Sequence, residues 1–143
     1  MPRTHCRPRP TQAKVLTPVT THCPECGHRL RTTRCKYRTV TTLDAVTRLT
    51  LRIRCCPDPD CPCYHRPYRP EAESLLALPH HEFGLDVLAL VGRLRHAEHR
   101  SVPEIHQELT RRGVVISRRS LSNLLDRYDE LRSVTVQTLP LPR

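Results

Sequence analysis

Two segments of the chain are predicted to be β-strands, and one of them alternates cleanly between polar and apolar residues, which is the pattern of a half-buried strand. The alternating segment runs from Val46 to Arg54, where leucine or isoleucine takes every second position from 49 to 53. Arginine and threonine fill the positions between them, so one face is apolar and the other is polar. The segment Arg29–Thr41 predicts a second strand, and Leu43-Asp44-Ala45 supplies the turn. The first half of the chain is therefore predicted to hold a β-hairpin.

The second half follows a helical period instead. Leucine and valine form a broad stripe from Gly84 to His99, which predicts a supporting helix. Ser101 is predicted to cap the next helix, because Glu104 lies where its carboxylate can accept the Ser101 amide hydrogen. Gly113 predicts a left-handed end to that helix. This half is therefore predicted to form a small helical bundle.

Ser117 is predicted to cap a third helix, whose apolar residues recur at positions 121, 124, 125, 128 and 131. A support helix followed by two capped helices around a short turn is typical of a helix-turn-helix domain. In that motif the start of the last helix enters the major groove, where arginine and asparagine can bond guanine and adenine. The predicted DNA contacts are Arg118, Arg119, Ser122, Asn123 and Arg127. The alternative is an ordinary solvated helix face.

The cysteines form two groups that flank the predicted hairpin. Cys23-Pro24-Glu25-Cys26-Gly27 has the spacing of a zinc knuckle, in which glycine lets backbone N–H groups face the sulfurs. In the second group Cys55, Cys56, Cys61 and Cys63 compete for two ligand positions. The Pro-Asp-Pro-Asp loop favours Cys56 and Cys61.

One structural Zn²⁺ bound by Cys23, Cys26, Cys56 and Cys61 is therefore predicted. Four thiolates leave no open position for water, so the ion is not expected to catalyse a reaction. The remaining candidates are weaker: His22 and His28 are read as neighbours of the knuckle, and Cys6 and Cys35 as spare thiols.

The net charge of the chain indicates the kind of partner that it binds. The chain of 143 residues has 24 basic and 14 acidic residues and a net charge of +10. Genomic base composition can explain the preference for arginine over lysine, but it does not explain the net charge, which favours a polyanion such as double-stranded DNA. A homodimer is compatible with this partner.

No segment predicts a membrane or secretory role. The first residues lack the apolar core of a signal peptide, and the longest apolar run, Val87–Val91, is too short to span a bilayer. A soluble, cytoplasmic protein with no membrane partner is expected. In that compartment eight cysteines are expected to be metal ligands or free thiols rather than disulfides.

The predicted fold class is α+β, with a small N-terminal zinc ribbon followed by a three-helix helix-turn-helix domain. The predicted division of the chain is a flexible basic arm (1–20), the zinc ribbon (21–65), a linker (66–82), the helix-turn-helix domain (83–134) and a disordered tail (135–143).

Several motifs resemble the N-terminal region of bacterial insertion-sequence transposases. They are CPEC at Cys23, CPDPDCP at Cys56, LPHHEFGLD at Leu78, SVPEIHQEL at Ser101 and SLSNLLDRYDEL at Ser120. The resemblance implies DNA binding at the ends of mobile elements, and it supports Cys56 and Cys61 over their neighbours as ligands.

Transposases of this kind continue into a ribonuclease-H-like domain with spaced carboxylates. Here Asp126, Asp129 and Glu130 lie together on one predicted helix, where they could not surround two metal ions. A DNA-binding fragment without enzymatic activity is therefore expected. The alternatives are a stand-alone zinc-ribbon and helix-turn-helix regulator of transcription, and an RNA-binding or protein-interaction module, which the low aromatic content disfavours.

Overall fold

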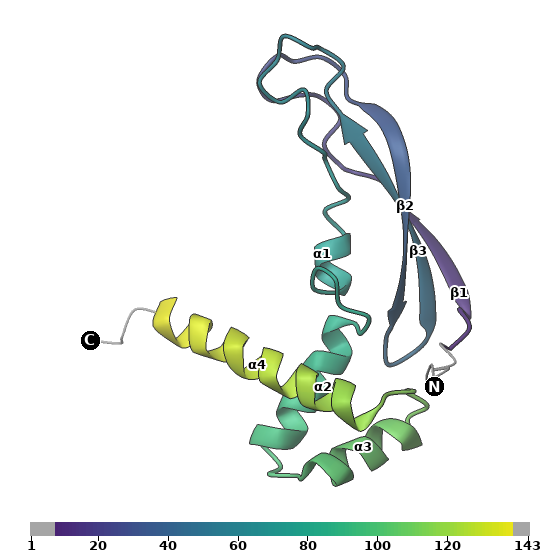
Figure 1. Cartoon of the computed structure of the whole chain (residues 1–143), viewed down its shortest axis with the longest axis vertical. Helices are drawn as coiled ribbons and strands as arrows, with labels where there is room; N and C mark the ends of the chain where they lie inside the picture. Colours follow the sequence, from purple (N-terminus) through teal and green to yellow (C-terminus); the bar gives the residue numbers. More distant parts are fainter. Residues whose placement is uncertain (1–7, 139–143) are drawn as a thin grey trace, which may run out of the picture.

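The computed structural model describes residues 8–138. Three strands and four helices follow one another along the chain: β1 (Gln12–Leu16), β2 (Arg31–Thr41), β3 (Val46–Cys55), α1 (Glu73–Leu76), α2 (Leu85–His96), α3 (Val102–Arg111) and α4 (Arg118–Thr138). The α+β class is therefore confirmed. Figure 1 shows an elongated molecule, with a long sheet at one end, the helices α2, α3 and α4 at the other, and α1 between them.

The sheet is built on the predicted hairpin. Strands β2 and β3 pair antiparallel from Arg31–Cys55 to Thr41–Val46, and their turn is closed by a 2.9 Å bond from the Thr42 N–H to the Ala45 carbonyl. The strand bounds differ from the predicted ones by only one or two residues at the outer ends. The difference is small because the regular alternation in β3 marks the extent of the hairpin.

Strand β1 corrects the prediction of a flexible arm over residues 1–20. Gln12–Leu16 pairs parallel to Thr47–Leu51, which gives the strand order β1-β3-β2. The pairing is made to a strand distant in the sequence, and five residues with an exposed lysine carry no pattern of their own that predicts it. Residues 1–7 of the predicted arm lie outside the described residues.

The apolar face of the sheet is covered by the linker. Leu49, Leu51 and Ile53 are buried together with Val40 and with Ala77, which directly follows α1. The linker also extends the sheet, because Tyr68 and Arg54 exchange two backbone hydrogen bonds of 3.1 and 2.8 Å. The predicted linker is thus a packed layer that includes α1.

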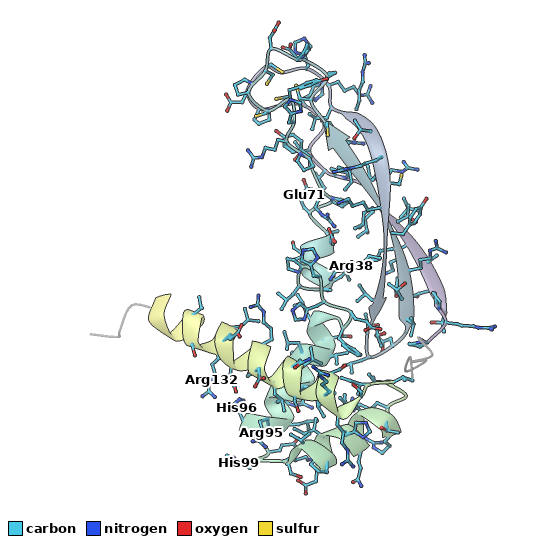
Figure 2. The ribbon with its side chains drawn as sticks, in the orientation of Figure 1. Arg38, Glu71, Arg95, His96, His99 and Arg132 are labelled. Atoms are coloured by element: carbon cyan, nitrogen blue, oxygen red, sulfur yellow. The ribbon has the colours of Figure 1, made fainter. Side chains whose placement is uncertain are left out.

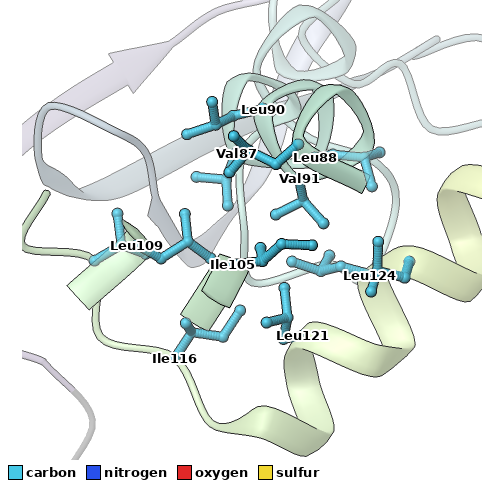
Figure 3. Packing of buried hydrophobic residues seen from close by; sticks show 12 residues of the cluster. Val87, Leu88, Leu90, Val91, Ile105, Leu109, Ile116, Leu121 and Leu124 are labelled. Carbon is cyan, nitrogen blue, oxygen red and sulfur yellow. The ribbon is translucent and has the colours of Figure 1, made fainter. Parts of the chain in front are cut away.

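The helices α2, α3 and α4 enclose a separate apolar core (Figure 3). The predicted inward residues Ile105, Leu109, Leu121 and Leu124 are all buried there. Among residues 8–138, no helix is both long enough and apolar enough to cross a membrane.

Helix α4 is longer than predicted. It continues to Thr138, so residues 135–138, which were predicted to belong to a disordered tail, are helical. The physical reason is that neither glycine nor proline interrupts the sequence between Arg118 and Thr138. The rest of the predicted tail lies outside the described residues.

Candidate metal centre and nucleic-acid interface

The first cysteine turn leads into β2. The Gly27 N–H donates to the Cys23 carbonyl and the Cys23 N–H to the His28 carbonyl, both at 2.9 Å. Gly27 has a φ of 74°, a left-handed conformation that glycine adopts without strain. The turn therefore brings Cys23 and Cys26 to the same side of the loop.

The second cysteine turn follows β3 directly. The Asp60 N–H bonds to the Asp58 carboxylate at 3.0 Å, and the Cys61 N–H bonds to the Asp58 carbonyl at 3.1 Å. These bonds fold the Pro-Asp-Pro-Asp loop back, so that Cys61 returns to Cys56. The antiparallel hairpin places both cysteine turns at the same end of the sheet, farthest from the helices (Figure 1).

The structure brings together the four cysteines that the sequence predicts as ligands. The Sγ atoms of Cys23, Cys26, Cys56 and Cys61 all lie within 4.8 Å of one another. The Cys23–Cys61 pair is separated by 3.6 Å and the Cys26–Cys56 pair by 3.4 Å, much farther than a disulfide of about 2.05 Å. Around a tetrahedral metal with bonds of about 2.3 Å, sulfur atoms are about 3.8 Å apart. The cluster therefore fits a thiolate-bound metal ion.

The protonation of the cluster is uneven. The backbone N–H of Cys26 is the main cause that lowers the pKa of Cys23 to about 6. The backbone N–H of Cys63 acts in the same direction on Cys61, but burial and the neighbouring thiols outweigh it and raise the pKa of Cys61 to about 12. Burial also raises the pKa of Cys56. A bound metal would have to displace the protons of these thiols, so its affinity would increase with pH.

The remaining described cysteines lie outside this cluster. Cys63 is buried beside Tyr68, whose pKa is raised to about 12 by burial and then by this thiol. The Cys55 Sγ contacts the Thr33 hydroxyl at 3.6 Å, and Cys35 is exposed on β2. Cys6 lies outside the described residues.

The histidines near the cluster differ. His28 and Asp58 each place an atom within 4.8 Å of the Cys26 Sγ, and they lie 3.8 Å from each other. The sequence offered His28 only as a weaker ligand, and it did not single out Asp58, which reads as part of the loop between Cys56 and Cys61. His22 bonds the Thr21 hydroxyl instead.

The start of α4 is fixed by its neighbours. The Ser117 hydroxyl accepts the Ser120 N–H at 3.1 Å, as the predicted cap requires. His106 on α3, which the sequence did not single out, bonds through Nε2 to the Ile116 carbonyl at 2.9 Å and so holds the turn. Gly113 ends the preceding helix with a φ of 84°. The turn between α3 and α4 is therefore fixed at both ends, by Gly113 and His106 on the α3 side and by the Ser117 cap on the α4 side.

Four of the five predicted DNA contacts share one property. Arg118, Arg119, Ser122 and Asn123 are exposed, and within residues 8–138 their side chains make no hydrogen bond or ion pair. Arg127 differs, because it is half-buried and its Nη1 bonds Glu130 at 2.9 Å. The Arg127 side chain is therefore paired within its own helix. The sequence alone could not distinguish this pairing from a side chain that is free to contact DNA.

Two of the three acidic residues of α4, Asp129 and Glu130, have polar partners as well. Asp129 accepts from His96 Nε2 at 2.8 Å, and Arg132 donates to His96 Nδ1 at 3.1 Å. Because the guanidinium donates to Nδ1, the ring proton is on Nε2. Figure 2 shows His96 and Arg132 close together where α2 meets α4. This network joins the second half of α4 to the supporting helix.

Comparison with models of protein families, with curated proteins and with solved structures gave no match to this chain.

Proposed function

We propose that this protein is a metal-stabilised, sequence-specific DNA-binding protein in which α3, the turn and α4 form a helix-turn-helix. One observation carries the proposal. At the start of a capped helix, Arg118, Arg119 and Asn123 are exposed and have no polar partner in the described chain, whereas Asp129 and Glu130 farther along are paired. Unpaired arginine and asparagine at the start of such a helix are the groups that read guanine and adenine in the major groove.

The metal in this proposal is zinc, and its role is structural. Four thiolates in a tetrahedral arrangement favour Zn²⁺, and they would fill its coordination sphere. The hairpin and its two turns would then form a zinc ribbon. The apolar core at this end of the sheet is small: it consists of the four clustered cysteines, Cys63 and Leu30, with Tyr68 packed against them. Metal binding would therefore supply much of the folding free energy of this end.

The DNA target remains a choice between two classes. The resemblance of the sequence motifs to insertion-sequence transposases favours the ends of mobile elements, and a promoter is the alternative for a regulator of transcription. Both targets require sequence-specific binding by α4.

The test is selection of binding sites from a library of random duplexes, followed by affinity measurements on the selected and on random DNA. Arg119→Ala and Asn123→Ala are each expected to lose about 1–3 kcal/mol of discrimination. Ser133→Ala, on the same helix but distant from its start, is the matched control and should bind as the wild type does. Unchanged discrimination in Arg119→Ala and in Asn123→Ala would exclude the assignment of the start of α4 to the major groove.

A further inference from the structure

The charge of the protein is concentrated on the sheet. The three strands contain eight basic residues and no acidic residue. The basic residues are Lys14, Arg31, Arg34, Lys36, Arg38, Arg48, Arg52 and Arg54. By contrast, α2, α3 and α4 contain seven basic and six acidic residues and are nearly neutral. Most of the net charge of +10 therefore lies at a distance from the proposed reading helix.

Two of these eight cations are used to hold the fold. Arg38 pairs with Glu73 at 3.0 Å, and Arg54 donates to the carbonyls of Pro18 and Thr20 at 3.3 and 3.2 Å. The other six have no acidic partner within residues 8–138. Like charges on neighbouring strands repel one another, so the sheet keeps an electrostatic cost that a polyanion would remove.

The uncovered face of the sheet has a regular row of donors. Figure 1 shows α1 on one side of the sheet and, among residues 8–138, no helix or strand on the other. On this open face β3 presents Arg48, Thr50 and Arg52 at alternate positions, opposite Thr39 and Tyr37 of β2. Residues on one face of a strand follow each other every 6.7 Å or so. Successive phosphates of a nucleic-acid strand have a comparable spacing, so the row of cation, hydroxyl and cation matches a row of phosphates.

The residues beside this row suit the phosphate backbone of a nucleic acid better than an apolar protein surface. Tyr37 is 65% exposed, and the Arg48 guanidinium carbon lies 5.2 Å from its ring centroid. This contact orients Arg48 along the face while its N–H groups stay available. A protein surface of mixed charge would meet no acidic group on these strands, and Val15 is the one large exposed aliphatic side chain on the described part of the face.

We propose that the open face of the sheet binds the phosphate backbone of duplex DNA through Arg48, Thr50 and Arg52. The proposal takes its ligand from the proposed function, but it uses different residues and a different kind of contact. Phosphate contacts supply affinity and salt dependence without sequence preference. The sheet would thus hold the duplex, and α4 would read it.

The experiment measures the affinity of the full chain for a random-sequence duplex over a range of salt concentrations. The double variant Arg48→Gln/Arg52→Gln removes two phosphate contacts, so the slope of log affinity against log salt should become shallower by about 1.8. Arg93→Gln/Arg95→Gln on α2 removes the same charge elsewhere and should keep the wild-type slope. Arg48→Lys/Arg52→Lys keeps the charge and should also keep the slope. Thermal unfolding of all three variants establishes that the fold is retained.

Three results would overturn the proposal. The first is a wild-type slope for Arg48→Gln/Arg52→Gln. The second is an equal change in the α2 variant, which would indicate net charge alone. The third is that Arg48→Gln/Arg52→Gln loses binding to phosphatidylserine vesicles while its binding to the duplex is unchanged. This result would indicate that the sheet binds an anionic membrane surface. Failure of the groove assignment is distinguishable, because Arg119→Ala and Asn123→Ala act on discrimination and the sheet variants act on the salt slope.

Discussion

Arg38 on β2 and Glu73 on α1 form a buried ion pair, with 3.0 Å between Nη1 and Oε1 (Figure 2 labels Arg38). Glu73 also accepts two bonds from Arg69, at 3.0 and 2.9 Å. The other end of the Arg38 guanidinium donates to the carbonyls of Leu78 and His81, on the segment that leads to α2. The pair therefore connects the sheet to the chain that enters the helical bundle.

We expect Glu73→Gln to destabilise the protein by about 1–3 kcal/mol, because it leaves a largely buried guanidinium without its counter-charge. Denaturant unfolding measures this change. Leu75→Ala on the same short helix removes a side chain that is 78% exposed, and it should change the free energy of unfolding very little. Equal stability of Glu73→Gln and the wild type would show that the pair contributes no net stability.

Acid should remove the contribution of Glu108. Hydrogen bonds from Arg111 and then from Arg112 lower the pKa of this carboxyl to about 2. A lowered folded-state pKa stabilises the protein at pH values above the unfolded pKa of about 4.3, and this stabilisation is lost as the pH falls toward about 2. The difference in unfolding free energy between the wild type and Glu108→Gln should therefore decrease over that range. A difference that does not depend on pH would contradict the assignment.

Metal binding should require the four clustered cysteines and no others. We expect about one zinc ion per chain, and a chelator should unfold the cysteine turns while the core of α2, α3 and α4 persists. Cys61→Ala should lose the metal, whereas Cys35→Ala and Cys63→Ala should keep it. Metal analysis and circular dichroism measure the two effects. Full metal content in Cys61→Ala would show that another ligand, such as His28, completes the site.

Gly92→Ala should destabilise the contact between α2 and α4. A Cβ at this position would overlap the ring of Tyr128. Alanine is favoured over glycine in a helix by about 1 kcal/mol, and overpacking a core costs about 1–3 kcal/mol, so the steric effect should dominate. Thermal unfolding measures the sum. Adding Tyr128→Leu should recover part of the loss, and a stabilising Gly92→Ala would show that α4 moves without cost.

The elements with a local cause were predictable from the sequence. The regular alternation from Leu49 to Ile53 predicted the hairpin, and Ser101, Glu104 and Gly113 predicted the bounds of α3. Cys56 and Cys61 were favoured because a loop of two prolines and two aspartates can join them, and the structure places both beside the first turn.

The features with a distant cause were not predictable. Strand β1 exists because β3 offers it an edge, and Glu73 is buried because it meets Arg38 on a remote strand. Gly92 reads as an ordinary residue of an apolar stripe, although a side chain at this position would overlap the ring of Tyr128 on α4. The basic residues of the strands can be counted in the sequence. The sequence does not show that the linker and α1 cover only one face of the sheet and leave Arg48 and Arg52 on the other.

The length of the hairpin has a further consequence. β2 contains eleven residues, and at about 3.4 Å per residue it extends roughly 34 Å from the cysteine turns to the helical end. One turn of B-form DNA repeats after about 34 Å. If the sheet lies along a duplex as proposed, it would span about one helical repeat. The cysteine turns at its tip and the helical end of the molecule would then meet the same side of the DNA.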